Sequence, residues 1–137
     1  MKANELMIGD FATRKNYENK TVVCKIIGLS KNSISVEFDN GSRSMGASED
    51  SITPIPLTTE ILESNQFVHG YGDSDFYDYE KWEKIVNDKT IRVIKDSSGW
   101  FCRVDDKTMT RSMGISPFVH IVQHIIRIGG VEYEIKL

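Results

Sequence analysis

The chain has 137 residues, a length that suits one ordinary domain or two small modules, because domains cluster at roughly 100–150 residues. Its 39% hydrophobic and 27% charged residues are ordinary for a globular protein and exclude a disordered chain. No apolar run approaches the roughly 20 residues that cross a bilayer, and the first residues do not resemble a signal peptide. We therefore expect a cytoplasmic protein without a membrane partner.

The formal net charge of −3 is unevenly distributed along the chain. Residues 1–57 carry seven basic and seven acidic groups, residues 58–88 carry two basic and eight acidic groups, and residues 89–137 carry eight basic and five acidic groups. The first segment therefore lacks the basic excess with which proteins neutralise phosphates. Acidic residues are concentrated in the middle of the chain.

The N-terminal segment shows the pattern of short strands joined by turns. Apolar side chains recur at every second position in two runs, as in strands with one buried face. After the second run, Asn40-Gly41 favours a type I′ turn. Five short strands within 1–57 are typical of a Src-homology-3-like small β-barrel, and an open meander fits the same pattern. Strands are expected at 21–29, 33–39 and 42–47, and more briefly around Phe11 and Ile52.

A helix is expected over 58–65. The Thr-Pro-Ile-Pro segment before it stays extended, because each proline disfavours helical geometry in the preceding residue. Thr58 is a suitable N-cap, and Leu57 can pack on Leu62 as a hydrophobic staple.

Residues 70–88 mix acidic and aromatic side chains, and their secondary structure stays open. Phe76, Tyr79, Trp82 and Val86 fit one face of a helix. The run Phe76, Tyr77 and Tyr79 also suits a strand. Periodicity alone therefore does not decide between the two.

The remaining chain predicts a sheet covered by a helix. Strands are expected at 90–96 and 100–106 and through 109–113. A helix then runs from Ser116 as N-cap, with Pro117 as its first residue, to Gly129-Gly130. Its apolar side faces the core, and the alternation in 131–137 predicts a last strand. The opposite side of the helix is expected to be a solvated stripe of His120, Gln123, His124 and Arg127.

Together these elements predict an α+β protein. We expect a Src-homology-3-like small β-barrel module at 1–57, followed at 58–137 by an α+β module in which a β-sheet packs with an amphipathic C-terminal helix. The two modules are expected to pack together as one compact unit.

No catalytic or cofactor-binding motif is present, so we expect no catalytic residue, no cofactor and no enzymatic activity. His120 and His124 are weak metal candidates, because their spacing lets two imidazoles of one helix reach one ion. A metal-dependent enzyme, with His69 or a distant carboxylate as a third ligand, is the least favoured function. Cys24 and Cys102 lie in apolar, strand-like runs and are expected to be buried free thiols.

The acidic, aromatic segment and the helix stripe are the features that folding explains least. Aromatic residues are enriched in interface cores, although these also suit a seam between the modules. We predict a non-enzymatic accessory or adaptor protein that binds another protein, with its oligomeric state left open. The alternative is a nucleic-acid-binding module, provided that Arg92, Lys95, Arg103, Lys107 and Arg111 gather on one sheet face. The interaction candidates are Tyr71, Phe76, Tyr79, Trp82, His120, Gln123, His124 and Arg127.

Three stretches follow a recognisable order: MKANELMIGD, ITPIPLTTEILESNQF and FVHIVQHIIRIGGVEYEIKL. They resemble a group of short proteins of gut Bacteroidales, often carried by prophages and mobile elements. Members typically begin with K-x-N-E-L-x-I-G, carry P-I-P-L-T-x-E-I-L near the middle and finish with a V-H-x-x-Q helix, where this chain has Ile121 in place of a Leu. The group has no established activity, so the resemblance implies an intracellular protein of phage or mobile-element origin and assigns no role to His120 or Gln123.

Overall fold

The structure is a computed structural model that describes residues 6–73, 78–97, 99–105, 107–113 and 118–137. The chain is a mixed α+β protein, as predicted, and divides into two units, Met1–Ile55 and Pro56–Leu137. Among the described residues, no helix combines the length and the apolar character that crossing a membrane requires.

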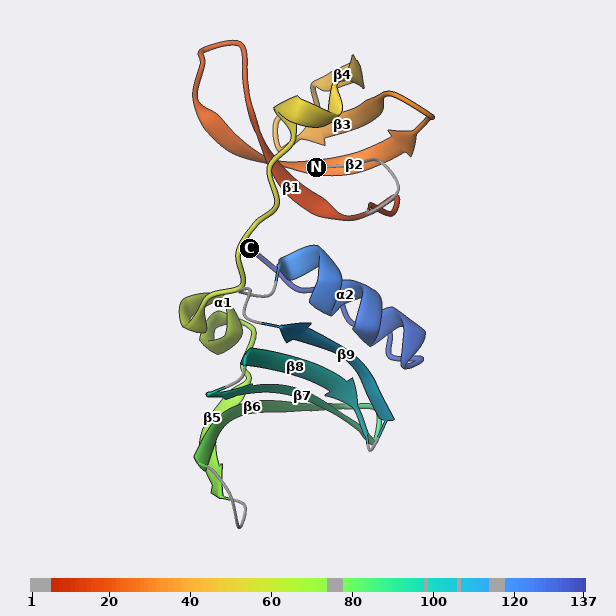
Figure 1. Cartoon of the computed structure of the whole chain (residues 1–137). Coiled ribbons are helices and arrows are strands. Elements are labelled where there is room, and N and C mark those ends of the chain that lie inside the picture. The colour runs from red at the N-terminus through yellow and green to blue at the C-terminus, as the bar shows by residue number, and fades with distance from the viewer. Residues whose placement is uncertain (1–5, 74–77, 98, 106, 114–117) are drawn as a thin grey trace. The chain divides into compact units, whose positions relative to one another are not determined.

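The first unit is a four-stranded antiparallel sheet whose strands are adjacent in chain order (Figure 1). A β-bulge between Ile26 and Gly28 bends its longest strand. After the 3₁₀ turn η2 (Glu49–Ser51) the chain returns to the first strand, where Thr13 and Thr53 exchange two backbone hydrogen bonds of 2.9 Å. Four of the predicted strands are therefore confirmed, whereas the strand expected around Ile52 is reduced to this single bridge. The strands are β1 (Phe11–Lys15), β2 (Thr21–Leu29), β3 (Ile34–Phe38) and β4 (Arg43–Ala47).

Alternation along the strands decides which face of this sheet is buried. Ile34, Val36 and Phe38 of β3 point into one apolar core together with Cys24 and Ile26 of β2. Burial raises the pKa of Cys24 to about 11, so this thiol is protonated at neutral pH. The prediction of a buried free thiol is confirmed here and at Cys102, whose pKa burial raises to about 12.

The turn after β3 differs from the predicted type I′ turn. Gly41 has a φ of +82°, but Asn40 does not have the positive φ that a type I′ turn also requires there. Three residues instead of two lie between the last hydrogen-bonded pair, in which the Phe38 N–H donates to the Ser42 carbonyl (2.9 Å). The Asn40 side chain accepts from the Ser42 N–H (2.9 Å) and stabilises this longer loop.

The second unit is a five-stranded antiparallel sheet with both of its helices on one face (Figure 1). Residues 78–86 form a strand, so the acidic, aromatic segment is extended there and not helical. Phe76 and Tyr77 lie outside the described residues. The predicted hairpin and the strand through 109–113 are confirmed, except that the second hairpin strand, predicted at 100–106, ends at Val104. The strands are β5 (Val68–Asp73), β6 (Asp78–Val86), β7 (Lys89–Asp96), β8 (Gly99–Val104) and β9 (Lys107–Met113).

Helix α1 (Thr59–Ser64) begins where its capping residue predicts. The Thr58 hydroxyl accepts a hydrogen bond from the Ile61 N–H (3.2 Å). Leu57 and Leu62, the two residues of the predicted staple, are both buried. The sequence-based prediction of this helix is confirmed.

We expect Thr58→Ala to destabilise the second unit by about 1 kcal/mol, because an N-terminal N–H of α1 loses its acceptor. Both tryptophans of the chain, Trp82 and Trp100, lie in this unit. Tryptophan fluorescence during urea unfolding therefore measures the stability of this unit alone. Thr59→Ala, one position further and not the cap, is the matched control, and an equal loss in both variants would contradict the assigned cap.

Helix α2 (Val119–Ile128) packs against β8 and ends at Gly129. Phe118 occupies the N-cap position, so the predicted start at Ser116 and Pro117 was wrong; those two residues lie outside the described part of the chain. An antiparallel bridge between Phe118 and Pro56 holds Phe118 in an extended conformation and delays the helix.

Residues 131–137 do not form the predicted strand. Two carboxamide side chains take the place of a neighbouring strand and bind the backbone of this C-terminal segment. Gln123 donates through Nε2 to the Tyr133 carbonyl (2.6 Å) and accepts from the Ile135 N–H through Oε1 (2.7 Å). The Asn65 carboxamide binds the Lys136 carbonyl and N–H in the same way, at 2.8 Å each. Buried or half-buried side chains therefore alternate with exposed ones along most of this segment, as predicted, although the segment forms no strand.

Candidate functional site

The stripe of α2 that was predicted to face solvent is buried or half-buried. His120 and Gln123 are only 4% and 5% exposed, while His124 and Arg127 are half-buried. The prediction failed because the C-terminal segment binds Gln123 from the side that the helix wheel leaves polar. The rings of His120 and His124 meet edge to face at 5.7 Å, and the described residues contain no group of three or more side chains that could hold a metal ion.

The aromatic candidates of the acidic segment occupy different environments. Tyr71 is 73% exposed, and Trp82 is 2% exposed. Tyr79 is half-buried with its ring against Gly72, where an added Cβ would lie 2.1 Å from the Tyr79 ring carbon Cζ. Gly72 therefore makes room for the ring. Phe76 lies outside the described residues.

Trp82 is the middle ring of an aromatic stack that crosses the sheet. Its cross-strand partner on β5 is His69, and the two rings stack at 4.8 Å with an interplanar angle of 13°. On the other side the Trp100 ring of β8 stacks at 5.6 Å and 20°. The stack lies on the sheet face that carries α1, because Thr59, Glu60 and Glu63 of that helix line the same pocket as the three rings.

A pocket of about 330 Å³ opens between this stack and the first turns of α1. That volume is at the small end of the range for ligand sites, roughly 300–1,000 Å³. Five elements of the second unit, α1, β5, β6, β7 and β8, contribute side chains to its wall, and these side chains are partly apolar and partly charged. It is lined by Leu57, Thr58, Thr59, Glu60, Glu63, His69, Glu80, Trp82, Lys95 and Trp100.

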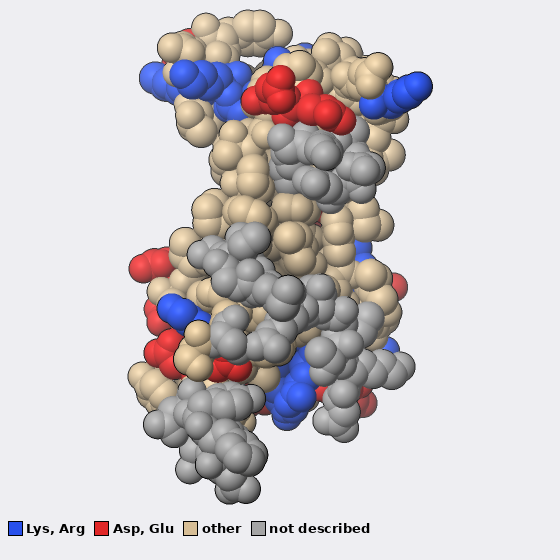
Figure 2. All heavy atoms as spheres, viewed as in Figure 1, with Lys and Arg blue, Asp and Glu red and all other residues tan. Residues whose placement is uncertain are grey.

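Negative charge prevails in the pocket. Three carboxylates and one ammonium line it, so its formal charge is −2 with His69 neutral. The Glu60 backbone N–H and then the hydroxyls of Thr58 and Thr59 lower the pKa of Glu60, which keeps this carboxylate ionised. Figure 2 shows acidic side chains grouped over α1 and the neighbouring part of the sheet.

The remaining charges of the pocket are held near its aromatic rings. Glu80 Oε1 lies 3.7 Å from His69 Nε2, and Lys95 Nζ lies 5.3 Å from the centre of the Trp100 ring. Glu80 and Lys95 are direct cross-strand partners on β6 and β7. Glu63, on α1, is exposed and makes no ion pair with another described residue.

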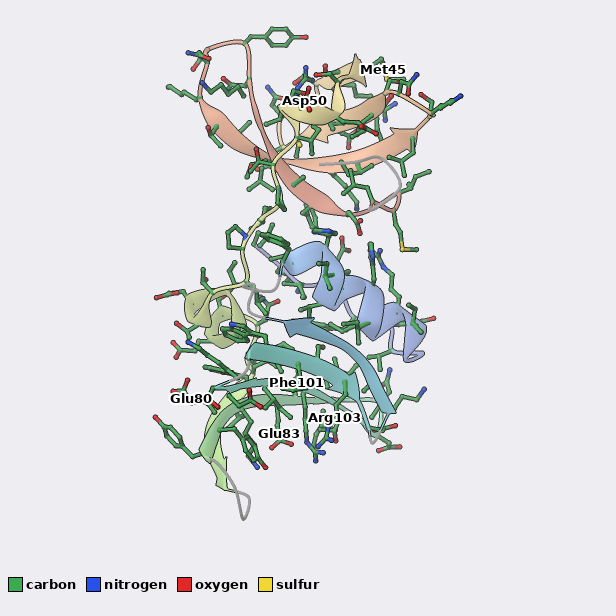
Figure 3. The ribbon with its side chains drawn as sticks, viewed as in Figure 1. Met45, Asp50, Glu80, Glu83, Phe101 and Arg103 are labelled. Carbon is green, nitrogen blue, oxygen red and sulfur yellow. The ribbon has the colours of Figure 1, made fainter. Side chains whose placement is uncertain are left out.

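Three of the five basic residues named for nucleic-acid binding have described side chains, and these three do not all share one face of the sheet. Arg92 and Arg103 are cross-strand partners, and Figure 3 shows Arg103 and Glu83 on the face turned away from the helices. Glu83 accepts from Arg92 Nε (2.8 Å), and this bond lowers the pKa of Glu83. Lys95 lies on the pocket face instead. The side chains of the other two, Lys107 and Arg111, lie outside the described residues.

Sequence reasoning singled out Trp82 and missed most of the pocket. The sequence pattern suggests His69 only as a metal ligand and does not group Glu80, Lys95 and Trp100. The available signal was period two, because Glu80 and Trp82 share one strand face and Lys95 lies directly opposite Glu80. This period applies only if residues 78–86 are a strand, and the sequence pattern does not decide between helix and strand there.

Comparisons of the chain with protein-family models, with curated proteins and with solved structures found no match in any of the three.

Proposed function

We propose that the protein is a non-enzymatic accessory or adaptor protein that binds another protein, and that the pocket of the second unit receives a lysine or arginine side chain of this partner. The observation that carries the proposal is the pocket itself, in which three carboxylates and a single ammonium surround an aromatic stack.

The alkyl stem and the charged group of a basic side chain both find matching surface in the pocket. Its alkyl stem packs against apolar surface while its charged group stays near solvent and counter-charges. Leu57 and the indole of Trp100 offer the apolar surface, and Glu63 and Glu80 offer the carboxylates. The protein's own Lys95 already places an ammonium over the Trp100 ring, an arrangement favoured by the quadrupole of the indole.

Nucleic-acid binding remains the second function, with less support from the geometry. A phosphate would meet net negative charge in the pocket, and proteins hold phosphates with an excess of basic groups. On the opposite sheet face, Glu83 already pairs with Arg92. A protein partner therefore agrees better with the charges of the second unit.

The proposal extends to the first unit and to the origin of the protein. We infer a Src-homology-3-like small barrel for the first unit; the bulge in β2 and the Thr13–Thr53 bridge support it, since both bring the last segment back beside the first strand. We also infer a cytoplasmic protein of phage or mobile-element origin, which rests on the sequence resemblance.

The pocket is tested by titrating acetyl-Gly-Ser-Lys-Ser-Gly-amide and the same peptide with norleucine in place of lysine, with tryptophan fluorescence as the signal. Both tryptophans line the pocket, so the signal is specific to it. The lysine peptide is expected to bind more tightly. Glu63→Gln should weaken it about fivefold, which corresponds to about 1 kcal/mol, and should leave the norleucine peptide unchanged.

Glu132→Gln, a change of the same charge at an exposed position of the C-terminal segment, is the matched control and should leave binding unchanged. The proposal would fail if the lysine and norleucine peptides bound equally well. Equal weakening by Glu63→Gln and Glu132→Gln would show long-range attraction in place of a pocket.

A further inference from the structure

We propose that the partner segment binds as an added β-strand along the outer edge of β5, with its basic side chain reaching the pocket. The inference rests on the proposed function of the pocket and specifies how the partner chain is held. Extended peptides that add a strand to a sheet edge gain affinity from main-chain hydrogen bonds and specificity from alternate side chains.

Strand β5 is an edge of the five-stranded sheet. It pairs with β6 over its whole length, from Val68 opposite Glu83 to Asp73 opposite Asp78, and it is the terminal strand in the sheet order. An edge strand presents a row of backbone N–H and C=O groups on its outer side that a further strand can pair with.

The sequence of β5 lacks the usual protection of an edge. Natural edges are commonly shielded by lysine, proline, bulges or inward charges. Strand β5 reads VHGYGD, without Lys, Arg or Pro, and its pairing with β6 has no register shift. By contrast, the edge strand β9 contains Lys107 and Arg111, and β4 contains Arg43 and pairs through a register shift.

The alternation of β5 places the pocket within reach of an added strand. His69 and Tyr71 point to the pocket face, and Val68 and Gly70 to the other. An added strand would lie roughly 5 Å beyond β5, and hence roughly 10 Å from the backbone of β6. A lysine side chain and the Glu80 side chain together cover that distance. The exposed Tyr71 ring lies between them as a surface for the alkyl stem.

Charge selects a partner peptide over a second copy of this chain. Pairing of two β5 strands would bring VHGYGD opposite itself, and this segment carries no Lys or Arg to complement the carboxylates of the pocket. Exposed Val68 and Tyr71, on opposite faces of the same edge, suit the alternating apolar side chains of an extended segment. The occupant is therefore an extended segment with a basic residue between β-forming residues.

The test uses acetyl-Thr-Val-Lys-Val-Thr-amide as the probe, with N-methyl groups placed on alternate backbone amides in two variants. One set of amides donates to β5 in an added strand, and the other set points away. N-methylation of the first set should weaken binding about tenfold or more, and N-methylation of the second should change it little. Hydrogen exchange of amides within Val68–Asp73 should slow on binding of the unmodified probe.

The outcomes separate the two proposals. If neither N-methylated variant binds differently from the probe while norleucine in place of lysine weakens binding, strand addition is overturned and the pocket stands. If norleucine binds as well as lysine while one N-methylated variant fails, the edge binds peptides without the pocket. Dimerisation of the free chain, measured by sedimentation, with β5 amides protected in the dimer, would assign the edge to a second copy and overturn the inference.

Discussion

Replacing Trp82 with alanine is expected to lower the free energy of unfolding of the second unit by about 3–5 kcal/mol, the range for deletion of a large buried aromatic side chain. The Trp82 ring is 2% exposed and lies between the rings of His69 and Trp100. The substitution removes both ring contacts and leaves a cavity in the middle of the stack. Urea unfolding followed by the fluorescence of the remaining tryptophan, Trp100, measures the loss.

Trp82→Phe and Tyr71→Ala are the matched controls. Phenylalanine keeps a ring in the stack and removes an indole N–H that has no hydrogen-bond partner among the described residues, so its cost should be well below that of alanine. Tyr71 is exposed in the same segment, and its loss should change stability by less than about 0.5 kcal/mol. A Trp82→Ala protein as stable as Tyr71→Ala would contradict a buried stack.

Gln123→Ala is expected to lower the free energy of unfolding of the second unit by about 2–4 kcal/mol, because one buried and one partly buried backbone group lose their hydrogen-bond partner. These are the carbonyl of Tyr133 and the N–H of Ile135, which the Gln123 carboxamide binds at 2.6 and 2.7 Å. Hydrogen exchange should speed up at the Ile135 amide before it does so in the sheet. Chemical unfolding and exchange measure the two effects.

Gln123→Met separates these hydrogen bonds from packing. Methionine is close to glutamine in length and flexible enough to fill the same space, but it offers no carboxamide. It should therefore be nearly as destabilising as alanine. A Gln123→Met protein with the stability of the natural chain would show that the side chain acts through its volume, and would contradict the hydrogen-bonded C-terminal segment.

Much of the fold follows from local sequence. Buried side chains recur at every second position in two runs within residues 21–39, and turn residues separate the runs, so strands β2 and β3 could be located with their buried faces. Helix α1 could be placed because its cap, Thr58, acts on an N–H three residues away. In both cases the residues that decide the structure are close together in the chain.

The C-terminal helix shows where local pattern fails. A helix wheel identifies His120 and Gln123 as polar, but it does not show whether their partner is water or a distant backbone. Gln123 binds a segment ten residues further along the chain, and Asn65 binds the same segment across 71 positions. Those hydrogen bonds occupy the carboxamide of Gln123, a side chain that the pattern alone assigns to solvent.

The pocket was hidden for a related reason. Glu63, His69, Glu80 and Trp100 come from four elements, and only the register of β5 to β8 and the position of α1 bring them together. Register is set by pairing between strands, which the sequence of one strand does not contain. Trp82 was identified because a large aromatic residue is conspicuous by itself.

The most direct test of the account is an NMR measurement of intermolecular nuclear Overhauser effects between acetyl-Gly-Ser-Lys-Ser-Gly-amide and the protein. We expect contacts from the lysine methylene protons next to the ammonium to the indole of Trp100, together with shifts of both indole N–H signals, since both tryptophans line the pocket. Contacts to the first unit alone, or unshifted indole signals at saturating peptide, would contradict it.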